Sequence, residues 1–246
     1  MPKKITIIAI LIVFGGISWG VFATSNPHTW TDGLVGYWSF DGQYTTSTDG
    51  TKDVSNNGNW GAFNGGVKPV AGISGQALSF DGVDDYVLLP DVASLQPTDA
   101  ITIEAWIKPN TVSDTSNDIV AIKLKSSVYK GVLLRQKLGG LQFWVGNGTI
   151  QLYPLSSSVF QVDNWFHVVG RWDGNEISLW INGQKDSNTA ILAGPIQYEP
   201  TRTIMIANWS GSWFNGLIDE VRIYSRALGT DEIMQHYLQT RRNLRL

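Results

Sequence analysis

One carboxylate near the C-terminal end of the chain stands where an apolar side chain is expected. Residues 217–224 have the period-two pattern of a strand, which places Asp219 in a row with three apolar side chains. A buried, ionised carboxylate is costly unless hydrogen bonds, an ion pair or a metal ion compensate its charge. We therefore expect Asp219 to have a partner: backbone amides, an arginine such as Arg171 or Arg222, or a bound cation.

Several aromatic side chains lie in loop sequence, where packing does not explain them. Gly, Asn and Ser surround Trp60, Trp209 and Trp213, and Tyr153 ends a short predicted strand. An aromatic ring can stack on the flat face of a sugar, and a large exposed aromatic side chain often marks a binding surface. We predict Trp60, Tyr153, Trp209 and Trp213 as ligand-binding residues. The alternative is that the loop tryptophans cap the ends of the fold.

A third group of side chains suits turn formation better than chemistry. Asp81, Asp84 and Asp85 lie around Gly82, between two apolar runs. Aspartate side chains commonly accept hydrogen bonds from their own backbone in turns. We therefore predict a turn here, in preference to a metal site.

The elements that must position these side chains are predicted to be short antiparallel strands. Only 16% of the 246 residues are charged, against roughly 25% in an ordinary soluble domain, and the chain contains 26 Gly and 11 Trp. Glycine-containing pairs between alternating apolar runs are strong hairpin signals, because type I′ turns need positive φ angles. Four such pairs occur here: Gly139-Gly140, Asn147-Gly148, Asp173-Gly174 and Asn182-Gly183. Together they predict an all-β, two-sheet antiparallel sandwich.

Two further elements can be assigned from pattern. Residues 100–108 alternate cleanly, which predicts a long strand with one wetter face that carries Glu104 and Trp106. A short C-terminal helix is predicted to begin at Thr230, which can cap it, with Asp231 and Glu232 at its positive end.

The N-terminal segment predicts export. Two lysines precede the apolar run 5–14, and the sequence ending in Ala23 fits a secretory cleavage site. The alternative is a retained membrane anchor over residues 5–22, which is just long enough to span a bilayer. The globular part is then secreted or in the cell envelope, and the absence of cysteine suits a bacterial or archaeal envelope. The predicted division is 1–23 signal peptide or anchor, 24–33 linker, 34–228 sandwich domain, and 229–246 helix and basic tail.

The charge of the chain argues against a nucleic-acid partner. The formal net charge is −3, and the concentrated basic stretch is residues 241–245 at the C-terminus. Nucleic-acid-binding proteins usually carry a clustered basic surface. We interpret the basic stretch as a solvated tail, and we expect membrane contact only if the N-terminal segment is retained.

An ordered set of motifs resembles a known family. The chain is similar to the LamG, or laminin-G-like, jelly-roll branch of the concanavalin A-like lectin/glucanase superfamily. The motifs occur in the family's order over about residues 33 to 240; they are residues 33–41, 53–59, 78–87, 101–109, 165–169, 177–183, 214–224 and 225–228. The resemblance implies a jelly-roll sandwich in which the first and last strands lie near each other.

The resemblance also implies a structural calcium ion on the edge of the sandwich. Calcium takes six to eight oxygen ligands and tolerates irregular geometry. The candidate ligands are Asp41, Asp53, Asn57 and Asp219. The chain departs from the family after Asp41, where Gly42 and Gln43 replace the acidic residue that is common there.

Because the superfamily includes glycoside hydrolases, catalysis has to be considered. Retaining hydrolysis needs two carboxyl groups about 5 Å apart, which sandwich hydrolases commonly place at alternating positions of one strand. Glu104 is followed on its face by Trp106, and Glu176 by Ser178, so the chain has no such run. It also has no nucleophile elbow and no zinc-binding spacing. We predict that the protein is not an enzyme.

The function expected from the sequence is therefore binding. The first hypothesis is an exported, lectin-like carbohydrate-binding module that holds a glycan or a glycan-bearing surface through ring stacking and a few directed hydrogen bonds. The second is a structural or adhesive cell-envelope protein that contacts another protein. A glycoside hydrolase is the third and weakest alternative.

Overall fold

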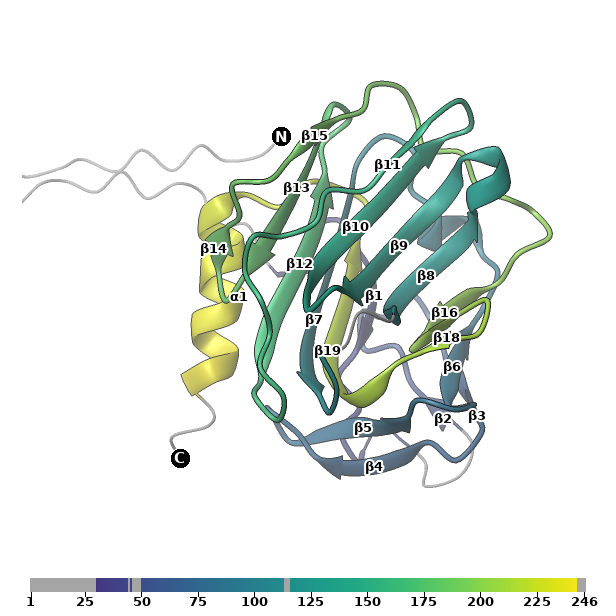
Figure 1. Ribbon diagram of the computed structural model, residues 1–246. Helices are drawn as coiled ribbons and strands as arrows, with labels where there is room; N and C mark the ends of the chain where they lie inside the picture. Colours follow the sequence, from purple (N-terminus) through teal and green to yellow (C-terminus); the bar gives the residue numbers. More distant parts are fainter. Residues whose placement is uncertain (1–29, 44, 46–49, 113–115, 243–246) are drawn as a thin grey trace, which may run out of the picture.

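The chain folds into a sandwich of two antiparallel sheets with one helix at its C-terminal end (Figure 1). The computed structural model describes residues 30–43, 45, 50–112 and 116–242. The predicted antiparallel sandwich and the C-terminal helix are confirmed. The predicted N-terminal signal or anchor helix lies outside the described residues.

The first sheet has nine strands, and its centre is β19 (Asn215–Tyr224). Its order begins at the edge strand β14 and ends at β4, with β1 paired to β19 and β15 paired to β13. The other members, in sheet order, are β14 (Gln184–Lys185), β13 (Glu176–Ile181), β12 (Phe166–Trp172), β7 (Ile101–Pro109), β5 (Gln76–Asp81) and β4 (Lys68–Ala71), with β1 (Leu34–Trp38) and β15 (Ala190–Ile191). The first and last strands therefore lie side by side, as the resemblance implied.

The second sheet has eight strands and is built around the meander β8, β9 and β10. Its order is β11 (Gln151–Leu152), β10 (Gly140–Asn147), β9 (Lys130–Lys137), β8 (Asn117–Lys125), β16 (Ile204–Ile206), β6 (Tyr86–Leu89), β3 (Gly61–Asn64) and β2 (Gly50–Thr51). A separate hairpin joins β17 (Asn208–Trp209) to β18 (Ser212–Trp213). Two short 3-10 helices, η1 (Ala93–Leu95) and η2 (Ser126–Val128), complete the connections.

The predicted hairpin turns are present, although not every predicted pair lies at the centre of its turn. Asn182 and Gly183 both have positive φ angles, of 53° and 77°, as a type I′ turn requires. The turn between β9 and β10 uses Leu138 and Gly139, because β10 already begins at Gly140. Pairing across each hairpin buries alternate side chains between the sheets. At one close contact only glycine fits, since a Cβ on Gly170 would lie 2.4 Å from the Phe143 ring.

A β-bulge in β19 overturns the period-two reading of that strand. The register against β7 pairs Asp219 with Trp106 but Arg222 with Glu104, so one extra residue lies between the two pairs. Glu220 adopts a φ of 53° there. Directly paired residues share a face, so Asp219 lies on the outer face with Trp106, while Ile218 and Val221 enter the core. The apolar row that was expected to contain Asp219 is therefore broken.

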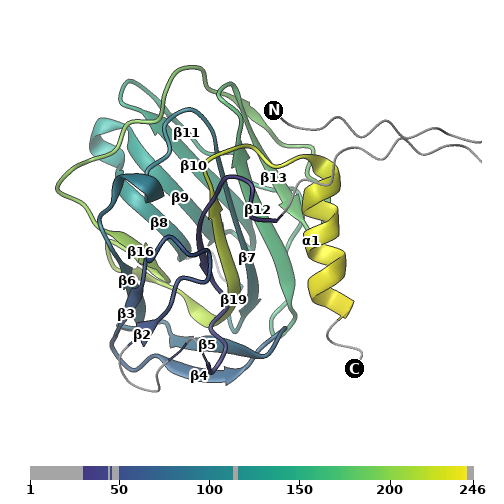
Figure 2. The same cartoon turned by 180° about the vertical axis from the view of Figure 1, so that it is seen from behind.

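The C-terminal helix α1 (Thr230–Arg242) packs on the outer face of the nine-stranded sheet, as Figure 2 shows from the opposite side. The Tyr237 ring stacks on Trp106 of β7 with 5.7 Å between ring centroids, and Ile233 packs among Trp180 and Tyr224. The face of residues 101–108 that was predicted to be wetter is consequently buried, with Glu104 fully inaccessible. In the described part of the chain, no helix has the length and apolarity needed to cross a membrane.

Candidate functional site

Three aromatic side chains gather on the outer face of the eight-stranded sheet, which α1 does not cover. The Trp144 ring lies 4.6 Å from the Tyr153 ring in a stacked arrangement and 6.2 Å from the Trp209 ring in a tilted one, between centroids. Tyr153 is 51% exposed, and the other two side chains are half-buried. We call Trp144, Tyr153 and Trp209 the aromatic platform.

Strand alternation and one hairpin bring the platform together. In β10, Phe143 and Val145 enter the core, which directs Trp144 to the opposite face. Trp209 comes from the β17–β18 hairpin, and its indole N–H donates to the Leu124 carbonyl of β8 at 3.1 Å. Beneath the rings lies a small apolar cluster outside the main core, formed by Ala121, Leu124 and Leu133. The platform is thus supported from below and open above Tyr153.

A buried ion pair adjoins the platform. Arg135 Nε lies 3.0 Å from Asp118 Oδ1, and the Arg135 guanidinium lies 5.3 Å from the centroid of the Trp144 ring. Burial raises the pKa of Asp118 to about 7, against the lowering effect of Arg135. Gln142 accepts a hydrogen bond from the Trp144 indole N–H at 2.6 Å. These buried groups therefore fix the Trp144 ring, and the exposed Tyr153 side chain is the part of the platform most open to a ligand.

The structure brings together two of the four predicted ligand-binding residues. Tyr153 and Trp209 meet around Trp144, whereas Trp213 pairs with Tyr86 at 5.8 Å between ring centroids. Trp60 is 61% exposed, with Lys52 Nζ at 5.4 Å from the centroid of its ring. A ligand-binding role for all four stays a prediction.

The sequence reasoning missed Trp144 and its charged neighbours. A usable signal was present: Trp144 alternates with Gln142 on the face opposite to Leu141, Phe143 and Val145. A tryptophan on the polar face of a hairpin is not needed by the core. Arg135 had no comparable signal, because its position beside Trp144 depends on the β9–β10 register.

Asp219 obtains its partners from backbone amides. Its Oδ2 accepts from the amides of Ile73 at 3.0 Å and Ser74 at 3.2 Å, and its Oδ1 accepts from the amide of Glu220 at 2.7 Å. Burial, reinforced by the charge of Glu220, raises the pKa of Asp219 to about 8 despite these hydrogen bonds. Of the partners expected for Asp219, the backbone amides are present, whereas Arg222 pairs with Glu104 and Glu220.

The other predicted calcium ligands also have backbone partners. Asp41 accepts from the Gln76 amide at 3.0 Å, so Asp41 and Asp219 both hold the turn at residues 72–76. Asp53 accepts from the amides of Tyr37, Ser55 and Asn59, and thereby fixes residues 53–59 against β1. The Asn57 amide donates to the Leu34 carbonyl at 3.0 Å. The four side chains thus divide into two pairs, and the calcium ion stays a prediction.

A different acidic group has closely spaced oxygens. Among the described residues, the one group of three acidic side chains whose ligand atoms lie within 4.8 Å of one another is Asp81, Asp84 and Asp85. The predicted turn is confirmed here, since Asp81 Oδ1 accepts from the amides of Val83 and Asp84. Asp85 accepts from the amides of Gly66 and Asp81.

The covered face of the nine-stranded sheet contains a buried ionic network. Glu104 lies 3.2 Å from Arg222 Nη1, 2.9 Å from His236 Nδ1 and 3.6 Å from His167 Nε2. Arg222 also pairs with Glu220, whose carboxylate accepts from the Tyr37 hydroxyl at 3.0 Å. Burial alone would raise the pKa of Glu104, but His236, His167 and Arg222 hold it well below its usual range. This network fastens α1 to the sheet.

Comparison with known proteins gives one family and a set of distant structural matches. Residues 80–234 match the Laminin_G_3 family, described as the concanavalin A-like lectin/glucanases superfamily. No curated protein sequence matches the chain.

Three solved structures illustrate the structural matches. Domain 4 of AbnA, a GH43 extracellular arabinanase from Geobacillus stearothermophilus, in complex with arabinotriose, aligns with a TM-score of 0.66 and 20% identity over 82% of this chain and 97% of that one. The binding domain of Paraclostridial Mosquitocidal Protein 1 gives 0.67 and 19%, over 84% and 52%. The binding domain of Botulinum neurotoxin DC, in complex with rat synaptotagmin II, gives 0.64 and 13%, over 85% and 52%. The chain therefore spans about half of each toxin binding domain, and these likenesses show the fold.

Proposed function

Because the chain belongs to the concanavalin A-like lectin/glucanase superfamily, we propose that it is an exported, non-catalytic carbohydrate-binding protein whose glycan rests on the aromatic platform. The observation that carries this proposal is the gathering of Trp144, Tyr153 and Trp209 on the sheet face that α1 leaves open. Such rings are costly to leave exposed to water unless a partner covers them.

The chemistry of the platform supports a sugar as the partner. The C–H groups of a sugar ring pack on an aromatic face, while its hydroxyls need donors and acceptors at the rim. Tyr153 supplies such a group, because its side chain is 51% exposed and ends in a hydroxyl that can donate and accept. The arabinotriose complex of the arabinanase domain is a precedent for sugar binding on this fold, at 20% identity.

Titration of soluble polysaccharides, arabinan among them, tests the proposal by calorimetry. Tyr153→Ala removes an exposed platform ring and should weaken binding by about tenfold or more, the effect of losing a central aromatic contact. Tyr129→Ala is the matched control, because Tyr129 is 49% exposed and lies outside the platform. Equal affinities for the two variants would remove the platform from the proposal. If sugars do not bind and Tyr153→Ala weakens retention on a protein, the adhesive-protein hypothesis replaces it.

We also propose a structural calcium ion, with Asp41, Asp53, Asn57 and Asp219 as the expected ligands. Asp41 and Asp219 support this most directly, because both carboxylates meet the turn at residues 72–76. An ion that binds only the folded state raises the melting temperature with increasing free calcium. A melt with calcium against chelator should show this rise, and Asp41→Asn should abolish it.

Asp84→Asn is the matched control for the calcium experiment, since Asp84 is exposed and belongs to the other acidic group. If Asp84→Asn abolishes the rise and Asp41→Asn does not, the ion belongs to residues 81–85. If calcium leaves the melting temperature of the wild-type protein unchanged, the proposed calcium site is wrong. Export is tested separately, by mass spectrometry of the mature N-terminus.

A further inference from the structure

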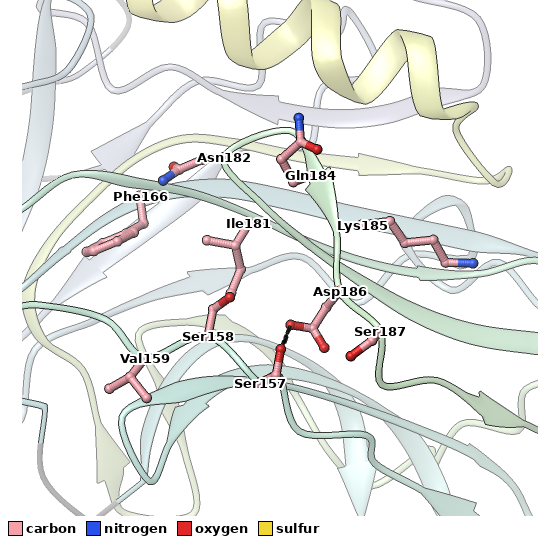
Figure 3. A pocket seen from close by; sticks show the side chains of 10 residues that line it. All are labelled: Ser157, Ser158, Val159, Phe166, Ile181, Asn182, Gln184, Lys185, Asp186 and Ser187. Atoms are coloured by element: carbon pink, nitrogen blue, oxygen red, sulfur yellow. Dashed lines mark hydrogen bonds between the residues drawn. The ribbon is translucent and has the colours of Figure 1, made fainter.

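Two cavities lie at the end of the sandwich where β13 and β14 meet the long connection before β12. The larger has a volume of about 530 Å³ and is bounded by Phe166, Ile181 and Gln184, with the connection at Ser157–Val159 opposite them (Figure 3). The smaller, of about 160 Å³, lies against α1. Asn182 lines both cavities. We call the two cavities together the edge groove.

The edge groove is lined by aromatic rings at its helix end. The smaller cavity is lined by Trp106, Trp165 and Tyr237, and the larger cavity is lined by Phe166. The Trp165 side chain is half-buried. Trp106 supplies a second observation, because its buried indole N–H has no hydrogen-bond partner among the described residues. A buried donor of this kind is satisfied when a ligand oxygen reaches it.

The amide between the two cavities is held rigidly. Asn182 Oδ1 accepts from the backbone N–H of His167 at 3.0 Å, and the backbone N–H of Asn182 donates to the His167 carbonyl at 2.8 Å. The next residue, Gly183, has a φ of 77°, a left-handed conformation that favours glycine. These contacts use the Asn182 side-chain oxygen, so its NH₂ group remains as a fixed donor at the centre of the groove.

The charges at the two ends of the groove differ. Arg241 lines the smaller cavity and donates to the Tyr237 hydroxyl at 2.8 Å, and no carboxylate of the described residues pairs with its guanidinium. In the larger cavity, Lys185 is paired with Glu176 at 2.6 Å. Asp186 there accepts from the Ser157 hydroxyl at 2.9 Å, as Figure 3 shows. An anionic group is therefore favoured at the Arg241 end alone, where a guanidinium can bind a carboxylate through two parallel hydrogen bonds.

We propose that the edge groove is a second carbohydrate-binding site, separate from the aromatic platform, and that it takes an oligosaccharide with an acidic sugar at its Arg241 end. Trp165 stacks on the acidic sugar, Arg241 binds its carboxylate, and the Asn182 amide donates to a hydroxyl of the neighbouring sugar. The larger cavity, beside Phe166 and Ile181, holds the rest of the oligosaccharide. The platform has no part in this binding.

Calorimetry with trigalacturonic acid and with its fully methyl-esterified form tests the proposal, because the ester keeps the rings and removes the charge. The wild-type protein should bind the acid about tenfold more tightly than the ester, as expected for one charge-assisted contact. Arg241→Gln should abolish that preference, while Arg202→Gln, which removes an exposed arginine from a loop outside the groove, should keep it. Trp165→Phe should weaken the binding of both forms, with a thermal melt confirming that the variant is folded.

Three results would overturn the proposal. The first is no binding of the acid by the wild-type protein. The second is an equal loss in Arg241→Gln and Arg202→Gln, which would mean that the acid is attracted only by overall charge. The third is loss of acid binding in Tyr153→Ala with none in Trp165→Phe, which would assign the acid to the platform. The platform proposal is judged independently, by the neutral polysaccharides.

Discussion

The two outer faces of the sandwich are built by the same strand alternation and end in opposite states. On the nine-stranded sheet, α1 covers a face whose charged groups are paired with one another. The Glu104 carboxylate, for example, contacts Arg222, His236 and His167. On the eight-stranded sheet, the outer face carries the buried ion pair Asp118–Arg135 and three rings in contact.

This difference between the two faces indicates that one stabilises the fold and that the other is available to a ligand. On the covered face, the charged groups Glu104, Glu220 and Arg222 pair with one another, and the aromatic rings of Trp106 and Tyr237 stack across the helix–sheet interface. On the open face, the Tyr153 ring stacks on Trp144 and is 51% exposed. We therefore expect substitutions on the covered face to change stability, and substitutions on the platform to change affinity.

The largest expected effect is that of Glu104→Gln on the covered face. Removing one partner of a buried ionic network leaves the opposite charge uncompensated, which costs on the order of 3–5 kcal/mol. The free energy of unfolding in urea measures this loss. A cost below that of a surface variant would show that α1 docks through its apolar contacts alone.

The second largest effect is expected for Trp144→Ala, which should lower the affinity for a glycan. Losing the ring at the centre of the platform should weaken glycan binding by about thirtyfold, the equivalent of a hot-spot contact of roughly 2 kcal/mol. Trp144→Phe, which keeps a smaller ring, should recover part of the affinity. The comparison of the two faces breaks down if Trp144→Ala loses as much stability as Glu104→Gln and no affinity.

The pH dependence of stability should also distinguish the faces. The pKa of Asp118 rises from 3.8 to about 7 on folding. The folded state therefore holds a proton that the unfolded state has lost, so the favourable contribution is full below about pH 4 and is lost as the pH rises through 7. The pKa of Glu104 is lowered, so its contribution is present above the ordinary value of 4.5 and is lost as the pH falls.

Asp118→Asn should consequently flatten the decline in unfolding free energy between pH 5 and pH 8. Urea titrations of wild type and variant at one-unit pH intervals measure the two slopes. Parallel slopes would mean that Asp118 is already ionised throughout this range. The loss of unfolding free energy at low pH, which we attribute to Glu104, should be the same in both proteins.

The smallest effect is expected for Glu176→Gln, which serves as the control for Glu104→Gln. Glu176 pairs with Lys185 at 2.6 Å, but both side chains are partly exposed. Exposed pairs of this kind contribute roughly 0–1 kcal/mol, and salt screens them. Unfolding in low and high salt should show a small difference that shrinks as the salt concentration rises.

Local patterns were sufficient for most of the secondary structure. The Asn182-Gly183 turn, the start of α1 at Thr230 and the turn hydrogen bonds of Asp81 all depend on residues close together in the chain. Alternation along β10 also indicates the face on which Trp144 lies, although the loop tryptophans were predicted as ligand-binding residues in its place.

The face of Asp219 could not be predicted from alternation. One extra residue in β19 turns the carboxylate away from the core row, and a bulge is visible only in the register between two strands. Its amide partners, Ile73 and Ser74, lie 146 and 145 residues away along the chain. A contact over such a separation depends on the whole topology of the sheet.

The sequence by itself determined the antiparallel sandwich, its hairpins and its C-terminal helix, because period-two burial, turn residues and helix caps act over a few neighbouring positions. The tertiary structure alone decided which outer face is covered, since burial of Glu104 required α1 to return across β7 from the far end of the chain. It likewise decided that Trp209 meets Trp144, because strand register and the docking of a hairpin are long-range choices.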